Sequence, residues 1–245
     1  IAPALTEALG GAFAVDVVSC NSQIGSGALP QEQIASAGIA IQPKAAQGQG
    51  RRLASLAAAL RALPGQVRQI LDALEQDGLA DDTIVIWTTD NGDGFPRAKR
   101  AVYDSGIKVP MIVRFPDGRG SGSVRDQLVS FIDLAPTILK LAGADVPGFI
   151  QGQDFLRGPQ RQYVLAARDR MDDVPDRVRA LRDSRFKYIR NSQAEVPYFR
   201  PLLFRDMFPA MQALWSGSHA DDLTAVQRFY FTAPRPAEEL YDTQA

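Results

Sequence analysis

Two apolar runs in the middle of the chain predict strands. TIVIWT at residues 83–88 and VPMIVRF at 109–115 place apolar residues at consecutive rather than alternating positions. Strands that are covered on both faces of a parallel sheet have this composition. Before them, apolar residues recur at helical spacing from Val67 to Leu74, which predicts an amphipathic helix that ends near Gly78.

The pattern changes in the last part of the chain. SFIDLAPTILKLAG, residues 130–143, predicts a short strand and then a helix, with Asp133 as the N-cap and Gly143 at the end. From about residue 159 the short runs YVLAAR, RVRALRD and FKYIRN are separated by polar turns, which is typical of an antiparallel sheet. Two amphipathic stretches follow, near 205–215 and 221–231. We therefore predict an α/β protein: a layered sheet followed by a small antiparallel sheet with a closing helix.

The first part of the chain has a different composition. FAVDVVS at 13–19 and GIAIQP at 38–43 predict strands, and regularly spaced leucines predict a helix that stops at Pro64-Gly65. A second helix begins there without a linker, and the composition shifts from Ala- and Gly-rich to richer in aromatic residues and arginine. We predict three segments, of which the first packs as a separate unit: 1–64, 65–158 and 159–245.

Composition limits the classes of function. Of the 245 residues 45% are hydrophobic and 22% charged, and the net charge is −1. These values fit an ordinary globular protein and give no basic footprint for nucleic acid. No apolar run is long enough to span a bilayer, so we expect no membrane partner. The opening IAPALTEALGG has no basic region and no apolar core, so we expect no signal peptide in this chain, and the compartment stays open.

Polar chemistry gathers in TTDNGDGFPRAKR, residues 88–100, directly after a predicted strand. In open α/β sheets ligands bind at the carboxyl ends of the strands. Asp90 and Asn91 offer a carboxylate and an amide oxygen, which suit Ca²⁺ or Mg²⁺ rather than zinc. Lys99, between Arg97 and Arg100, is a candidate to hold an anionic group. The alternative is an ordinary turn followed by a solvated basic loop, since two ligands do not complete a Ca²⁺ shell of about six to eight oxygens.

Three further residues are considered as candidates for binding or catalysis. Arg168, in AARDRMDD, ends a predicted strand and is a candidate to line a substrate pocket, with a surface salt-bridge cluster as the alternative. Cys20 is the single cysteine, which excludes an internal disulfide and fits a small core residue better than a nucleophile. His219 is the only histidine, and we expect it to decorate the last helix rather than act in catalysis.

Several blocks that occur in order resemble one family. ILDALEQDGLADDTIVIWTTDNGDGFPRAKRAVYDSGIKVPMIVRFP, VSFIDLAPTILKLAG, RDSRFKYIRN and EELYDT resemble the later half of the catalytic domain of type I sulfatases, which are metal-dependent hydrolases of the alkaline phosphatase superfamily. The resemblance covers residues 65–245 and is nearest in character to the heparan N-sulfatase-like branch. It implies a partial alkaline phosphatase/sulfatase-like layered sheet, Ca²⁺ bound by Asp90 and Asn91, and sulfate contacted by Lys99. The implied substrate is a sulfated small molecule or glycan, and relatives of this kind are often exported.

The chain departs from the family pattern at the nucleophile. The family makes a formylglycine from Cys or Ser in a C/S-x-P-x-R motif, whereas Cys20 is followed by NSQI. The family's early pair of metal-binding aspartates has no counterpart, and His219 is in the wrong place to replace its catalytic histidines. We therefore expect no catalytic residue here, half a metal site, and a truncated, inactive sulfatase-family protein.

Residues 1–64 resemble a different family. GGAFAVDVVSCNSQIGSGALPQEQIASAGIAIQP and LASLAAALRALP are similar to the C-terminal domain of bacterial L-seryl-tRNA(Sec) selenium transferase. That enzyme uses pyridoxal phosphate, but its cofactor lysine lies upstream of the similar segment, so Lys44 is not that lysine. Because the two resemblances meet at Pro64-Gly65, a non-catalytic chimeric remnant is a second hypothesis. A phosphate-ester hydrolase of the same superfamily is a third, because sulfate and phosphate are both tetrahedral anions.

Overall fold

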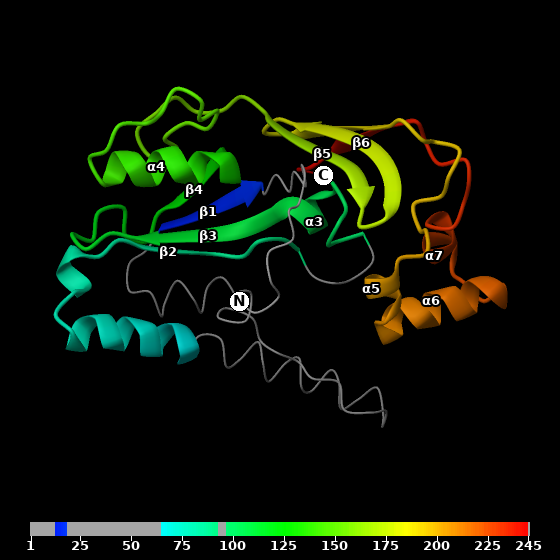
Figure 1. Ribbon diagram of the computed structural model, residues 1–245, viewed down its shortest axis with the longest axis horizontal. Helices are drawn as coiled ribbons and strands as arrows, with labels where there is room; N and C mark the ends of the chain where they lie inside the picture. The colour runs from blue at the N-terminus through cyan, green and yellow to red at the C-terminus, as the bar shows by residue number, and fades with distance from the viewer. Residues whose placement is uncertain (1–12, 19–64, 93–96, 245) are drawn as a thin grey trace. The chain divides into compact units, whose positions relative to one another are not determined.

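The computed structural model describes residues 13–18, 65–92 and 97–244, and for residues 13–18 the backbone alone (Figure 1). Within these residues the strands form two four-stranded sheets, as expected of an α/β protein. The first has the order β2-β3-β1-β4 and the second the order β5-β6-β7-β8. The strands of the first sheet are β1 Phe13–Val18, β2 Val85–Thr88, β3 Lys108–Arg114 and β4 Val124–Ser130. Those of the second are β5 Val164–Met171, β6 Val174–Arg182, β7 Phe186–Asn191 and β8 Glu238–Asp242.

The helices connect these strands. Residues 65–76 are helical. The other helices are η2 Ala80–Asp82, α3 Asp104–Ile107, η3 Phe131–Asp133, α4 Leu134–Leu141, α5 Leu203–Asp206, α6 Pro209–His219 and α7 Ala225–Phe229. Among the helices of the described residues, none combines the length and the apolar character that crossing a bilayer requires.

The described residues fall into two compact units. The first includes residues 65–87 and Met111–Arg125. Its core joins the apolar face of the 65–76 helix to the strands: Val67 and Leu71 pack with Ile112 of β3, and Trp87 of β2 packs against them. The predicted helix and both predicted strands are therefore confirmed.

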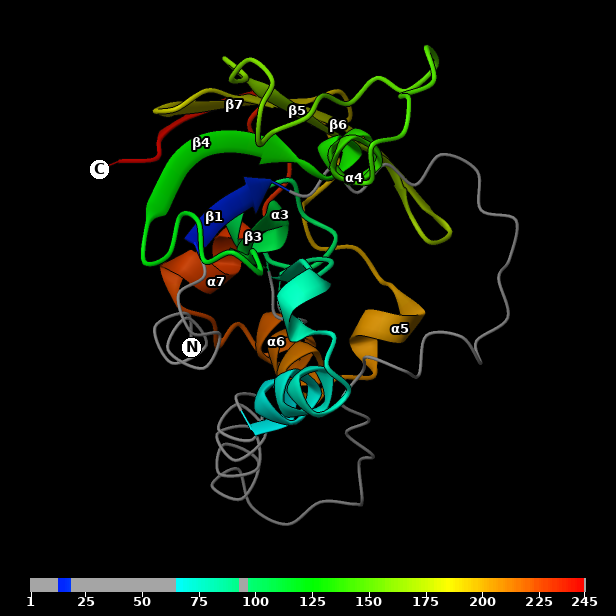
Figure 2. The ribbon, with the colours of Figure 1, turned by 90° about the vertical axis from the view of Figure 1, so that its left-hand side faces the viewer.

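The second unit includes residues 97–110 and 126–244, and its core lies under the second sheet. Burial alternates along the strands: Val178 and Ala180 of β6 and Ile189 of β7 are buried, while their neighbour Arg179 is exposed. Every pairing in this sheet is antiparallel, as predicted. Figure 2 shows β5, β6 and β7 as one layer. A register shift between Arg168 and Arg170 marks a bulge in β5, and bulges re-aim the side chains beside them.

The end of the chain differs from the prediction in one respect. The amphipathic stretches form α6 and α7, but these lie between β7 and β8 in sequence, so a strand follows the expected closing helix. The strand β8, with the sequence EELYD, was not predicted because its one buried position, Glu239, is a charged residue, so the sequence lacks the usual apolar strand pattern.

The first segment also packs differently from the prediction. β1 was expected in a unit separate from residues 65–245, yet it is hydrogen-bonded between β3 and β4. That prediction is wrong for β1, because its apolar, β-branched sequence FAVDVV can complete a sheet as readily as it can start one. The strand expected at 38–43, the helix before Pro64, and Cys20 and Lys44 lie outside the described residues.

The strand-helix unit around Asp133 is only partly as predicted. Helix α4 is present, and Gly143 follows it with a φ of 72°, the left-handed conformation that ends many helices. Asp133 occupies the N-cap position but does not cap α4 with its side chain. Its buried carboxylate instead accepts bonds from Ser130 N, at 2.9 Å, and from Arg161 Nε, at 2.7 Å.

Candidate functional site

The Asp90-Asn91-Gly92 turn begins two residues beyond the end of β2. The Asp90 side chain is exposed and that of Asn91 is half-buried. Gly92 N donates to Gly106 O at 3.0 Å, and a Cβ atom on Gly92 would lie 1.8 Å from Ser105 O. Only glycine permits so close an approach to the backbone of α3, so the turn is fixed to that helix. The backbone that carries the two predicted ligands is therefore fixed at Gly92.

The oxygen atoms of this turn are of the type that binds a hard divalent cation, but they are too few to complete its coordination shell. Asp90 and Asn91 offer two oxygens of the type that Ca²⁺ prefers. Within the described residues, no group of three or more His, Cys, Asp or Glu side chains is arranged to hold a metal ion. Asp104, a further acid near this turn in sequence, is engaged by Lys187 Nζ at 2.8 Å and Arg182 Nε at 3.3 Å. Asp93 lies outside the described residues.

The basic loop, residues 97–100, is held from its backbone. Ser105 Oγ donates to Arg97 O at 2.5 Å, and Ala101 N donates to Ala98 O at 2.9 Å. Arg97 and Arg100 have φ values of 64° and 72°, a left-handed conformation that is uncommon for residues with side chains. Such conformations persist only where the surroundings impose them. The packing of this loop therefore sets the positions of its cations.

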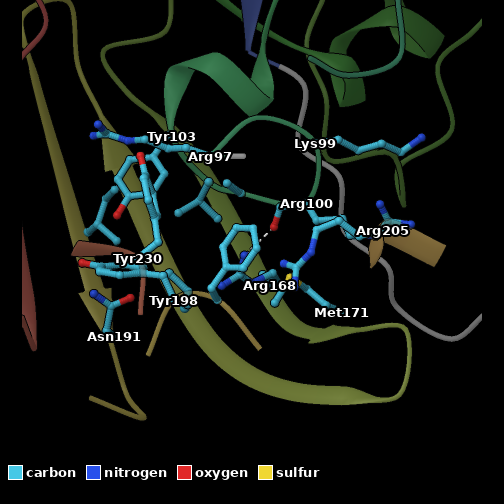
Figure 3. Close-up of a pocket in the computed structure, with 15 residues that line it drawn as sticks. Arg97, Lys99, Arg100, Tyr103, Arg168, Met171, Asn191, Tyr198, Arg205 and Tyr230 are labelled. Carbon is cyan, nitrogen blue, oxygen red and sulfur yellow. Dashed lines mark hydrogen bonds between the residues drawn. The ribbon is translucent and has the colours of Figure 1, made fainter. Parts of the chain in front are cut away.

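The cations of the loop do not all point the same way. The Arg97 guanidinium lies 4.2 Å from the centre of the Tyr103 ring, a cation–π contact. Figure 3 shows Lys99 directed away from Tyr103 and Arg168. Lys99 is exposed, so its amine is accessible to an anion in solution.

A small cavity lies behind the basic loop (Figure 3). Its volume is about 50 Å³. Arg168 is among the residues that line it, and its role in binding a substrate stays a prediction. The lining also contains Arg97, Lys99, Arg100, Tyr103, Met171, Asn191, Tyr198, Arg205 and Tyr230.

Arg168 belongs to a buried triad that its sequence did not reveal. Its guanidinium donates to Arg100 O and to Asp176, and Asp176 also accepts from Arg235. The Asp176 and Arg235 side chains are 1% and 0% exposed. Burial opposes ionisation of Asp176, but the bonds from Arg235 and Arg168 outweigh it and lower the pKa of the carboxyl. Burial lowers the pKa of Arg168 in turn.

Glu239 of β8 anchors Tyr103, which follows the basic loop in the chain, and sequence reasoning missed it. Its buried carboxylate accepts from Tyr103 Oη at 2.8 Å and from Asn191 Nδ2 at 2.7 Å, and Tyr241 also donates to it. Burial, reinforced by Glu239, raises the pKa of Tyr241 to about 12 and raises that of Tyr103 further. The sequence EELYD gave one signal, because an acid that is buried in a strand needs hydrogen-bond donors. The local sequence does not show which residues supply those donors.

His219 lies on α6 and not, as predicted, on the last helix, which is α7. It is the last residue of α6, it is exposed, and its Nδ1 lies 2.6 Å from Trp215 O in the same helix.

Comparisons with known proteins agree on one family. The model of the Sulfatase family matches residues 19–144, a range that crosses Pro64-Gly65. An ulvan-active sulfatase of Formosa agariphila is 41% identical over 186 residues, which are 75% of this chain and 31% of that protein. The human N-sulphoglucosamine sulphohydrolase is 36% identical over 81 residues, 33% of this chain and 16% of that protein.

A solved structure supports the fold. That of a 2-O GAG sulfatase superposes with a TM-score of 0.50 and 22% identity, covering 68% of this chain and 41% of that one. The predicted fold class, a partial alkaline phosphatase/sulfatase-like sheet followed by a small antiparallel sheet, is confirmed. The chain spans less than a third of the length of the ulvan-active sulfatase and of the human sulphohydrolase.

Proposed function

Because the chain belongs to the sulfatase family, we propose that it contributes to hydrolysis of a sulfuric ester or sulfamate, with Asp90 and Asn91 as metal ligands and Lys99 as the sulfate contact. The observation that carries this proposal is the turn after β2, where Gly92 packs on the backbone of α3 and fixes the backbone that carries the two oxygen ligands. The names of the ulvan-active and N-sulphoglucosamine relatives support a sulfated glycan as the substrate.

The chemistry requires positive charge around a sulfate group. A bound divalent cation would polarise the sulfuryl oxygens and stabilise the charge that develops on them. Asp90 and Asn91 would hold that cation from one side. The exposed Lys99 amine would donate to a sulfate oxygen, and its ammonium would favour the anionic group electrostatically.

We propose further that these 245 residues hold only part of the active site. The sequence has no C/S-x-P-x-R motif, since Cys20 is followed by NSQI. The nucleophile and the remaining ligands would come from residues that this sequence does not contain. With two oxygen ligands, most of the Ca²⁺ shell is left to water, so we expect millimolar or weaker binding, given that complete extracellular sites bind at roughly 0.1 to 1 mM.

Two measurements on the purified chain test both proposals. Calorimetric titration with Ca²⁺ should give weak binding that Asp90→Ala abolishes and that Asp81→Asn, at an exposed acid in η2, leaves unchanged. Turnover of an aryl sulfate with Ca²⁺ should be absent. Turnover that Asp90→Ala abolishes would support the function and refute the incomplete site. Ca²⁺ binding that is insensitive to both Asp90→Ala and Asn91→Ala would refute the metal ligands.

The second candidate is a non-catalytic chimeric remnant, which the missing motif favours. The family match across Pro64-Gly65 supports the first candidate instead. Reading the genomic DNA around these two codons separates them, because a remnant requires a deletion, frameshift or join there. Parallel assays on an aryl phosphate test the third hypothesis, a phosphate-ester hydrolase. Turnover of the aryl phosphate without turnover of the aryl sulfate would favour that hypothesis.

A further inference from the structure

The cavity behind the basic loop has a one-sided charge. Among the described residues that line it, none is acidic and five are cationic: Arg97, Lys99, Arg100, Arg168 and Arg205. Cationic side chains gathered around a small enclosed space repel one another more strongly than they would in water, because the local dielectric is lower. A cavity of this kind gains stability from an anion.

The acids nearby do not neutralise these cations fully. Asp176 is shared between Arg168 and Arg235, so one carboxylate serves two guanidinium groups. The Nε of Arg168 is buried and finds no hydrogen-bond partner in the part of the chain that the structure describes. A buried donor without a partner is costly, so this atom is available to an acceptor that enters the cavity.

Arg205 and Arg100 complete the positive cluster. Burial lowers the pKa of Arg205; Asp206, whose Oδ1 lies 3.4 Å from Arg205 Nε, opposes this shift, and the charges of Arg100 and Arg168 add to it. Arg100 has one ion-pair partner among the described residues, Asp172, at 3.5 Å. That pair is partly exposed, with the Asp172 side chain 45% accessible, so it competes weakly for the guanidinium.

The size of the cavity selects the ligand. At about 50 Å³ it can take a few atoms. A water needs on the order of 10–15 Å³ on this measure. The space therefore suits an oxyanion group and excludes a sugar ring.

We propose that the arginine cavity, defined by Arg100, Arg168 and Arg205, binds a sulfate or carboxylate group of the substrate that is distinct from the sulfate at Lys99. Lys99 contributes to the lining, but in Figure 3 its side chain extends away from Tyr103 and Arg168, so an anion at its amine would occupy a separate place. The substrate is then a glycan unit with a second anionic group. This last step rests on the proposed function, whereas binding of an oxyanion in the cavity does not.

Titration of the 245-residue chain with sodium sulfate, at constant ionic strength maintained with sodium chloride, tests the site. Arg100→Gln keeps the backbone carbonyl that Arg168 contacts and should weaken sulfate binding about tenfold, the usual effect of losing one charge-assisted hydrogen bond. Arg177→Gln is the matched control, because Arg177 is an exposed β6 arginine outside the cavity lining. It should bind as the parent does.

Asp172→Asn provides a test of opposite sign. Asp172 has a φ of 51°, a conformation that asparagine tolerates, so this variant should fold. Freed from its carboxylate partner, Arg100 should bind sulfate several-fold more tightly. No saturable binding by the parent, equal affinities for Arg100→Gln and Arg177→Gln, or unchanged affinity in Asp172→Asn would each overturn the site.

Comparing the affinities of a sugar disulfate and its monosulfate shows whether the anion in the cavity belongs to the substrate. The disulfate should bind more tightly, and Arg100→Gln should remove the difference. If inorganic sulfate binds but the disulfate has no such advantage, the substrate assignment is overturned while the anion site stands. None of these titrations requires turnover, so their outcome is independent of the aryl sulfate assay.

Discussion

Asp176 is the residue whose loss should destabilise the second unit most clearly. Asp176→Asn keeps the size of the side chain and removes its charge. Arg168 and Arg235 would then be left as buried guanidinium groups without a counter-charge. Breaking a buried ion pair by removing one partner typically costs about 3–5 kcal/mol.

This loss of unfolding free energy corresponds to a shift in the urea denaturation midpoint. With a urea dependence of about 2 kcal/mol per molar, a loss of about 3–5 kcal/mol lowers the midpoint by roughly 2 M. The pH dependence has a defined sign. Because the folded pKa of Asp176 is lowered, its contribution is present above the unfolded value of about 4 and is lost as the pH falls through the folded pKa.

Urea unfolding followed by the fluorescence of Trp215, which lies in the same unit, measures the effect. Asp169→Asn is the matched control from the same hairpin. Its pair with Arg179 is close, at 2.7 Å, but both side chains are about half exposed, so its loss should cost less than about 1 kcal/mol. If the two variants unfold at the same urea concentration, the burial argument is wrong.

Three further outcomes follow from the same contacts. Gly92→Ala should lower stability and abolish Ca²⁺ binding together, because its Cβ would overlap the backbone of α3; an intact calorimetric titration would contradict this. The protein should lose stability between about pH 10 and about 12, since the pKa values of Tyr103 and Tyr241 are raised and these side chains stay protonated longer in the folded state. Tyr103→Phe should make this alkaline loss smaller in urea titrations at about pH 9 and about pH 11, and an unchanged difference would exclude Tyr103 as a cause. Asp104→Asn should destabilise the protein by about 3 kcal/mol or more in urea, since Lys187 is buried against it, whereas Lys187→Met in the Asn background should restore part of the loss.

The elements that sequence predicted well have their cause in local pattern. The short β-branched apolar runs of β2 and β3 and the alternation in β6 and β7 are local patterns that favour strands over helices. Asp90 and Asn91 could be proposed as ligands from sequence because their chemistry and their place after a strand are contiguous in the chain. The packing of Gly92 against α3 was not visible.

The residues that sequence missed act across long separations. Asp176 meets Arg235 across 59 positions, and Asn191 meets Glu239 across 48. Arg168 looked like one member of a charged surface run, although the alternation along β5 places it on the same face as the buried Val164 and Ala166. Such pairings depend on register and on buried partners, neither of which a local pattern encodes.

The bond from Tyr103 to Glu239 sets an order of events during synthesis. The two residues are 136 positions apart in the chain. At a translation rate of about 5–20 residues per second, Glu239 is made roughly 7–27 s after Tyr103. For most of that interval the segment from the basic loop to Tyr103 lacks its β8 anchor, although β2 and β3 on either side of it have been synthesised. A chaperone or protease that samples the nascent chain therefore meets this loop in its unanchored form, whatever the stability of the finished protein.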